Sequence, residues 1–181
     1  MSTSTTVNGT AAHAEGNGTI ASGSYSHAEG QTTTASGSDS HAEGYRTEAS
    51  GDYSHAEGSR TTASGDVSHA EGFNTTASEQ RSHAEGANTT ASGPNSHAEG
   101  YSTTASGGSS HAEGVNATAS GEYSHAQNLG TIASSSGQTA IGKYNIEDSN
   151  NVYSFIIGNG SNVTRSNALM VDWNGNLCLS G

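Results

Sequence analysis

Nine histidines recur in this chain at a constant interval of fourteen residues, and this spacing constrains the fold more than any other feature. The series begins at His13 and ends at His125, and from His27 to His111 each histidine lies in a Ser-His-Ala-Glu-Gly phrase. A short fixed period indicates an array of stacked, nearly identical structural units. A catalytic site brings unlike residues together once, whereas this chain repeats the same residues. The pattern therefore favours a structural or binding protein and predicts no enzymatic activity.

Each repeat divides into two halves of seven residues. Residues 26–30 (Ser-His-Ala-Glu-Gly) and residues 33–37 (Thr-Thr-Ala-Ser-Gly) are each followed by two variable residues. Five extended residues and a two-residue corner make one side of a flattened coil, so we predict an all-β fold, a parallel β-roll or solenoid of fourteen-residue coils. Side chains alternate along a strand, which places His27 and Glu29 outside and Ala28 inside. The closing glycines are expected to supply corner conformations that other residues resist.

Large apolar residues are too few for an ordinary globular core. Ile, Leu, Val and Phe together number 18, of which seven lie in residues 1–137 and eleven in residues 138–181. We therefore predict a thin core of small side chains and association with identical chains, because one chain has little to bury. The shift in composition predicts an N-terminal lead-in or attachment segment (1–12), the β-roll array (13–137) and a β-rich C-terminal trimerisation segment (138–181). In the last, the Asn-Gly pair at 174–175 predicts a hairpin turn.

Charge and composition exclude several classes of partner. The chain carries 17 acidic and five basic residues, a net charge of −12, and has no basic stripe, so nucleic acid is not expected to bind. No apolar run approaches the length of a membrane span, so membrane insertion is not expected either. The N-terminal residues lack the charged and apolar regions of a signal peptide. Cys178 is the single cysteine, which rules out an internal disulfide, and we predict no cofactor.

The repeated phrase resembles the head repeats of trimeric autotransporter adhesins of the Yersinia type, over about residues 10–142. This resemblance implies a left-handed parallel β-roll with three chains per head. Residues 138–142 (Gln-Thr-Ala-Ile-Gly) look like the apolar form of the same phrase. The chain departs from that family at the positions of His27 and Glu29, which are usually aliphatic there.

The C-terminal segment is similar to a second group of proteins. Residues 143–148, 157–160, 165–168 and 171–176 look like the segment that precedes intramolecular-chaperone autocleavage domains in phage and prophage tail proteins of Gram-positive hosts. This resemblance implies a component of a phage tail fibre, spike or tail-like particle, located in the virion and made in the host cytoplasm. The expected partners are identical chains in a homotrimer, other tail or baseplate proteins, and host-surface glycan. The alternative is the head of a bacterial trimeric adhesin on the cell surface.

Histidine and glutamate columns on one face are predicted to form an interface ladder between the chains of the trimer. The ladder comprises His13, His27, His41, His55, His69, His83, His97, His111 and His125 with Glu15, Glu29, Glu43, Glu57, Glu71, Glu85, Glu99 and Glu113. Within a chain, like charges at the spacing of stacked strands repel, and histidine two residues away is the available partner.

Two further functions compete with this interpretation. Imidazole and carboxylate suit zinc or a similar ion, and the candidate ligands are His27, Glu29, His41 and Glu43. We predict no metal, because metal sites are discrete and need a closed ligand set. Thr34 and Ser36 could belong to an ice-binding face, but threonine in strands needs no special cause. A metal-binding or ice-binding solenoid nevertheless remains a further alternative.

Aromatic side chains recur in the variable corners, where a regular scaffold carries its specificity. They are candidate receptor contacts that would stack on host glycans. The alternative is that each packs on its neighbours one coil away. These residues are Tyr25, Tyr45, Tyr53, Phe73, Tyr101 and Tyr123.

Overall fold

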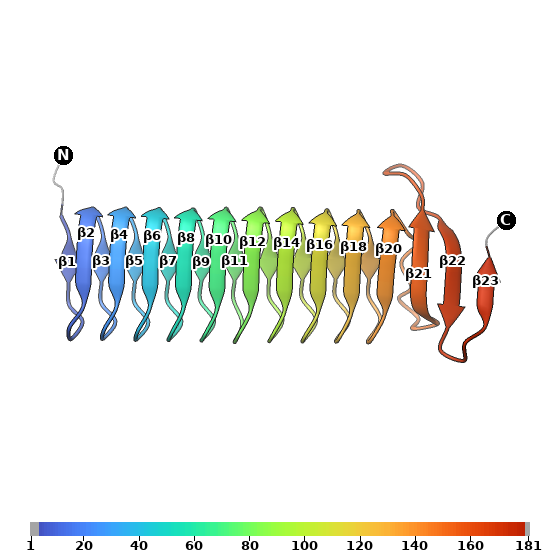
Figure 1. Cartoon of the computed structure of the whole chain (residues 1–181), viewed down its shortest axis with the longest axis horizontal. Coiled ribbons are helices and arrows are strands. Elements are labelled where there is room, and N and C mark those ends of the chain that lie inside the picture. The colour runs from blue at the N-terminus through green and yellow to red at the C-terminus, as the bar shows by residue number, and fades with distance from the viewer. Residues whose placement is uncertain (1–3, 180–181) are drawn as a thin grey trace.

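The computed structural model describes residues 4–179 as a parallel β-solenoid, which confirms the predicted fold class (Figure 1). Residues 1–3 and 180–181, at the ends of the predicted terminal segments, lie outside the described residues. Each coil contributes one strand to a ten-stranded sheet and one to a thirteen-stranded sheet, and the described residues contain no helix. Accordingly, this part of the chain offers no helix of the length and apolar character that a membrane span requires.

In the thirteen-stranded sheet, here called the histidine sheet, the strands from β2 to β18 have five residues and begin at the histidines. Its strands are β2 (His13–Asn17), β4 (His27–Gln31), β6 (His41–Tyr45), β8 (His55–Ser59), β10 (His69–Phe73), β12 (His83–Ala87), β14 (His97–Tyr101), β16 (His111–Val115), β18 (His125–Leu129), β20 (Thr139–Lys143), β21 (Tyr153–Asn159), β22 (Asn167–Asp172) and β23 (Leu177–Leu179). Strands β2 to β21 pair in parallel, so that each histidine up to His125 lies beside the histidine of the next coil.

The ten-stranded sheet, here called the threonine sheet, consists of two-residue strands. They are β1 (Thr6–Val7), β3 (Ile20–Ala21), β5 (Thr34–Ala35), β7 (Glu48–Ala49), β9 (Thr62–Ala63), β11 (Thr76–Ala77), β13 (Thr90–Ala91), β15 (Thr104–Ala105), β17 (Thr118–Ala119) and β19 (Ile132–Ala133). All of these strands are parallel and in register, which places equivalent residues of successive coils in columns along the solenoid.

The core between the two sheets is made of small side chains, as predicted. Ala28 from the histidine sheet and Ala35 from the threonine sheet are both fully buried, and the same holds in every following coil of the array. Thr33 and Ser26 are buried beside them, and the Ser26 hydroxyl donates a hydrogen bond to the Gly23 carbonyl at 2.7 Å. The backbones of the two sheets therefore lie close together, because only small side chains separate them.

The two glycine columns serve different purposes. Gly30 and its equivalents from Gly16 to Gly142 have φ between +92° and +116°, the left-handed range that the sequence predicted for corner glycines. Gly37 does not have a positive φ, so the prediction was wrong for its column. At Gly37 itself, a Cβ atom would lie 2.0 Å from the Gly51 carbonyl oxygen, so a side chain could enter only if the backbone shifted. Glu79 occupies this column without a positive φ, and its N–H donates to the Ser82 hydroxyl at 3.2 Å.

Left-handed backbone occurs at the second residue of nearly every corner, and these residues are mostly not glycine. Tyr25 has φ of 59°, Thr32 of 60° and Val67 of 59°. This conformation is costly for side chains branched at Cβ. Hydrogen bonds between coils offset this cost. For example, the Tyr25 N–H donates to the Thr10 carbonyl at 2.8 Å. From the sequence, left-handed backbone was predicted only for the corner glycines.

The C-terminal end adds three strands to the histidine sheet alone, and β21 and β22 are longer than the strands of the array. Strand β21 is parallel to β20, whereas β22 and β23 are antiparallel and form the hairpin predicted from the Asn-Gly pair at 174–175. Parallel pairing thus continues beyond residue 137, and the division into segments at that residue stays a prediction. Ile156 in β21 is the one large apolar side chain among the fully buried residues.

Candidate functional site: the histidine and glutamate columns

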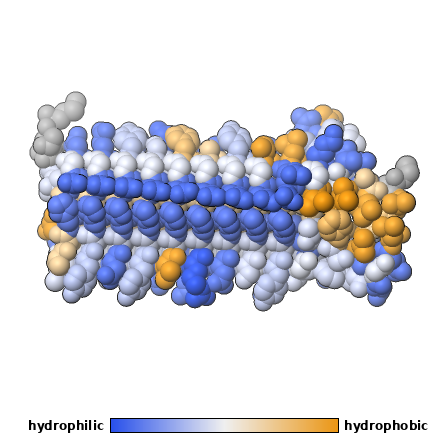
Figure 2. Space-filling view, viewed as in Figure 1, coloured by the Kyte–Doolittle hydropathy of each residue, from blue (hydrophilic) through white to orange (hydrophobic). Residues whose placement is uncertain are grey.

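The histidine column lies on the outer face of the histidine sheet. From His27 to His125, successive rings stack with centroids 4.7–5.0 Å apart and interplanar angles of 5° or less. The first ring, His13, is tilted by 59° against His27. Figure 2 shows the outer face as continuous hydrophilic bands that run along the solenoid. The strict strand register produces this column, because each coil places the same side chain at the same height.

The glutamate column runs beside the histidines, so that an imidazole lies between the carboxylates of two coils. His69 Nε2 is 3.9 Å from a Glu57 oxygen in the preceding coil and 3.8 Å from a Glu71 oxygen in its own coil. Contacts with the preceding coil shorten toward the C-terminus, to 3.7 Å for His97–Glu85, 3.4 Å for His111–Glu99 and 3.3 Å for His125–Glu113. Among residues 4–179, every ion pair joins these two columns, and none involves Lys or Arg.

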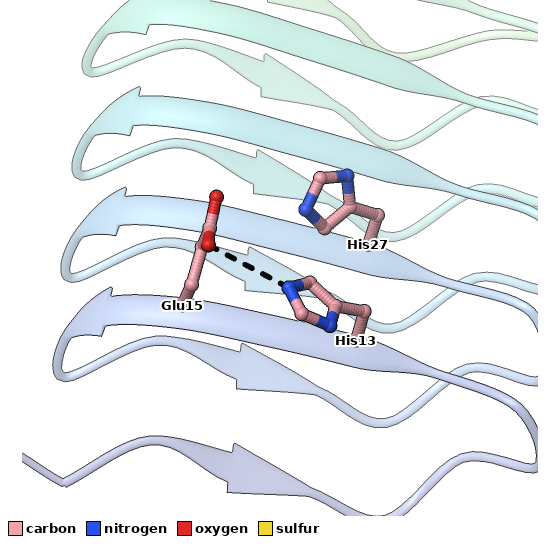
Figure 3. Close-up of side chains that lie close together, drawn as sticks. All are labelled: His13, Glu15 and His27. Carbon is pink, nitrogen blue, oxygen red and sulfur yellow. Dashed lines mark ion pairs between the residues drawn. The ribbon is translucent and has the colours of Figure 1, made fainter.

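Most imidazole Nε2 atoms are shielded from solvent but have no hydrogen-bond partner. Stacking covers the faces of each ring, and the neighbouring carboxylates lie at the edge of hydrogen-bonding distance or beyond it. Figure 3 shows the arrangement at the first coil, where the Glu15 carboxylate lies beside the His13 ring at 3.7 Å and His27 follows in the next coil. The buried, unpartnered atoms are Nε2 of His27, His41, His55, His69, His83, His97 and His111.

Burial lowers the pKa of His41 below its usual value, and the neighbouring His55 and His27 lower it further. Glu43 and Glu29 raise the same pKa but do not outweigh these effects. The sequence left this direction open, because burial and opposite charge act against each other. His41 is therefore held toward its neutral form, with a lone pair on one ring nitrogen.

Several adjacent side chains are placed closely enough to share a metal ion. Sets of three ligand atoms within 4.8 Å of one another occur along the columns, and His27, Glu29, His41 and Glu43 all belong to such sets. They include His13–Glu15–His27, Glu29–His41–Glu43, Glu43–His55–Glu57, Glu57–His69–Glu71 and His83–Glu85–His97. Because the next residue along each strand is glycine, the strip beside the carboxylates is hollowed into an open groove from Glu15 to Gly86.

Beyond His125 the same face becomes apolar. The histidine column continues through Thr139 to Phe155, Val171 and Leu177, since these residues are paired between adjacent strands. The glutamate column is continued by Ile141, Ile157, Leu169 and Leu179, which are paired between adjacent strands. We call Ile141, Phe155, Ile157, Leu169, Val171, Leu177 and Leu179 the apolar patch, which lies within the hydrophobic end in Figure 2.

The abundance of apolar residues in this segment was evident from the sequence, but their grouping into one patch was not predicted, because the fourteen-residue period ends before it. A weaker signal was present in three pairs of apolar residues spaced two apart, such as Phe155 and Ile157. Residues between the pairs face the interior, where Ile156 is fully buried and Met170 packs against the core. Leu177 and Leu179 are 60% and 70% exposed, so the end of the patch is open to solvent in the single chain.

The six corner aromatics form two separate rows. Tyr25, Tyr53 and Tyr123 precede their strands at one end of the histidine sheet, and all three are exposed with positive φ. The other three close their strands at the opposite end, and they are Tyr45, Phe73 and Tyr101. Arginines stack on this second row, with the Arg46 guanidinium 5.1 Å from the Tyr45 ring centre and Arg60 5.8 Å from that of Phe73. The rows could contact ligands only on different edges of the solenoid.

The remaining candidates lie apart from the columns. Ser26 is buried and bonded to the backbone, whereas His27 faces outward, so these neighbours do not form a nucleophile and its base. Thr34 lies on the outer face of the threonine sheet, and its position is taken by Glu48 in the next coil. A continuous threonine surface is therefore interrupted within the array.

Comparison with known families gives one match. Residues 84–110, 98–124 and 112–134 match the family model described as the YadA head domain repeat (2 copies). A search of curated proteins finds no significant match. The matched residues span coils from β12 to β19, and together with the β-solenoid fold they support adhesin-type head repeats in this chain. The resemblances to phage tail proteins and to the segment before a chaperone domain stay predictions.

Proposed function

We propose that this chain forms the head of a homotrimeric, adhesin-like surface protein, with a structural and attachment role and no catalysis. The observation that carries the proposal is the single face on which the histidine and glutamate columns run into the apolar patch. The match to the YadA head domain repeat supports the same kind of protein. A rigid array that repeats one pair of residues suits a shaft better than an enzyme.

The apolar patch is the part of this face that gains most from association. Exposed leucines such as Leu177 and Leu179 lose contact with water when identical chains cover them, which is the main driving force of such association. Among residues 4–179, strand β23 is the outermost strand at the C-terminal end of the histidine sheet. We expect the patch to hold the chains together and the polar columns to fix their register.

The polar columns extend the same interface along the array. Stacked glutamates at about 4.8 Å repel each other, and no Lys or Arg of the described residues pairs with them. Histidines of identical chains are the partners that a close-packed trimer would bring to these carboxylates. This arrangement replaces the aliphatic contacts implied by the adhesin resemblance with hydrogen-bonded pairs.

The proposed location is an exposed surface, either of a bacterial cell or of a virion. Adhesin-type head repeats favour the bacterial surface, whereas the C-terminal resemblance is the feature that favours a phage tail appendage. Attachment to a glycan would use the exposed corners, and the row of Tyr25, Tyr53 and Tyr123 is the better candidate because arginines do not cover it. Binding of the chain to a glycan array, compared with a variant that carries alanine at these three tyrosines, tests this part.

Light scattering on the purified chain tests the association. We expect a mass of three chains, and we expect the double variant Leu177→Lys and Leu179→Lys to dissociate at micromolar concentration. The matched control is Val152→Lys with Val163→Lys, which adds the same charge at exposed apolar residues outside the patch. A folded monomer from the unmodified chain, or equal dissociation of both variants, would contradict the proposed interface.

A further inference from the structure

The two columns also bring possible metal-coordinating atoms together within a single chain. Nε2 of His69 lies about equally far from Glu57 and Glu71, at 3.9 and 3.8 Å. Ligands held at about 2.0–2.1 Å around a tetrahedral zinc ion are about 3.3–3.4 Å apart. Side-chain rotations that move these atoms by about half an ångström would therefore complete a set of one nitrogen and two oxygens.

The nitrogen of each set is ready to act as a ligand. Seven of the Nε2 atoms are shielded from solvent without a hydrogen-bond partner, which is a costly state for a buried polar atom. Neutral imidazole is the form that binds metal. A cation placed between an imidazole and two carboxylates would satisfy the nitrogen and relieve the repulsion within the glutamate column.

We propose that the histidine and glutamate columns bind a row of divalent transition-metal ions of the zinc class, each held by one histidine and the glutamates of two successive coils. The three protein ligands leave one coordination position for water or for another ligand. The proposal uses distances within one chain, and an ion bound there would take the place of pairing between chains at the same side chains. Imidazole as a ligand predicts a preference for zinc over magnesium and calcium, which select oxygen ligands.

Shared carboxylates limit the number of ions. Each glutamate lies beside the histidine of its own coil and that of the next, as Glu57 and Glu71 do on either side of His69. The column from Glu15 to Glu113 holds eight glutamates, and taking two per ion gives at most four ions per chain. Occupation of alternate coils also separates the ions by about twice the strand spacing of 4.8 Å, which reduces their mutual repulsion.

Calorimetric titration of the full chain with Zn²⁺, after removal of metals with a chelator, tests the proposal. We expect saturable binding of about four ions per chain and a rise in melting temperature with Zn²⁺ concentration, because an ion that binds only the folded chain stabilises it. The test variant replaces every second glutamate of the column and so leaves no adjacent pair intact. Its substitutions are Glu29→Gln, Glu57→Gln, Glu85→Gln and Glu113→Gln.

A matched control removes the same charge elsewhere. It carries Glu48→Gln, Glu79→Gln, Glu122→Gln and Glu147→Gln, all exposed positions outside the column. We expect the control to bind Zn²⁺ like the unmodified chain and the test variant to lose saturable binding while keeping its circular dichroism spectrum. Equal binding of Zn²⁺ by the two variants would overturn the proposal. Binding of about eight ions per unmodified chain would overturn it as well.

A second measurement tests the proposed zinc sites even if the test variant does not fold. Zn²⁺ is titrated into the unmodified chain with a large excess of Mg²⁺ present. Binding that persists indicates a site that includes imidazole, whereas binding that disappears indicates attraction to carboxylates alone and overturns the proposal. Light scattering of the metal-free chain separates this outcome from a failure of the proposed association.

Discussion

The Asn145 side chain takes the place of a strand beside Ile132. Its Oδ1 accepts a hydrogen bond from the Ile132 N–H at 2.8 Å, and its Nδ2 donates to the Ile132 carbonyl at 2.9 Å. Ile132 lies in β19, the last strand of the threonine sheet, whose backbone groups would otherwise lack a partner in the next coil. Asn145 is fully buried, so one amide group ends the sheet without leaving an open edge.

Asn145→Ala is expected to destabilise the C-terminal end of the solenoid. Removal of the amide leaves the N–H and carbonyl of Ile132 without partners in a buried position, which costs about 2–4 kcal/mol. The free energy of unfolding, measured with a chemical denaturant, should fall by this amount. Asn162→Ala is the control, because Asn162 is exposed and its side chain makes no hydrogen bond in the described structure. Equal stability of the two variants would mean that Asn145 does not seal the edge.

A larger residue in the alanine core is expected to disrupt the array. Ala70 is fully buried between the two sheets, and Ala70→Leu should cost about 1–3 kcal/mol or more, because the neighbouring backbones leave no room. Ala87 closes a strand at a corner, where the same column holds Tyr101 in the next coil. Ala87→Leu should therefore leave the melting temperature nearly unchanged. A similar loss in both variants would show that overpacking of the core is not the cause.

The coil, the faces to which its side chains point and its core could be predicted, because the sequence repeats one local pattern many times. A strand has a side-chain period of two, so His27, Ala28 and Glu29 can be assigned to faces once the strand is recognised. The interior of alanine and small hydroxyl side chains follows from the same alternation. The histidine and glutamate columns were also predictable, since stacking of identical coils brings identical residues together.

Features at the end of the array and at its corners could not be predicted in the same way. The role of Asn145 depends on where the threonine sheet stops, and the apolar patch depends on the pairing of β21, β22 and β23, neither of which has a repeat. At the corners, Tyr25 and Val67 adopt positive φ because hydrogen bonds between coils hold the backbone there. Local preference alone would have assigned glycine.

The corner glycines of the histidine sheet are expected to resist substitution. Gly72 has φ of +106°, and a Cβ atom there would lie 2.2 Å from the Gly86 carbonyl oxygen. Gly72→Ala should lower the free energy of unfolding by about 1–3 kcal/mol, because both the conformation and the contact are unfavourable. Gly108 is the control, since a Cβ atom there meets no heavy atom closer than 3.7 Å. Gly108→Ala should leave thermal stability unchanged, and a comparable loss there would contradict the explanation.

Stability is expected to decrease in mild acid when no metal is present. The pKa of His41 is lowered in the folded chain, by burial first and then by His55 and His27, against the opposing influence of Glu43 and Glu29. The unfolded chain therefore binds the proton more readily, at a pKa of about 6.5. The contribution to stability is complete above that pH and is lost as the pH falls from about 6.5 toward the folded pKa.

The melting temperature of the chelator-treated chain, measured between pH 8 and pH 5, checks this sign. We expect a plateau above about pH 6.5 and a decrease below it. His41→Gln should reduce the decrease, because it removes one ring that resists protonation between His27 and His55. A melting temperature that rises as the pH falls through 6 would mean that imidazolium–carboxylate pairs outweigh burial and repulsion between rings. In that case the columns would be held together by charge and not by stacked neutral rings.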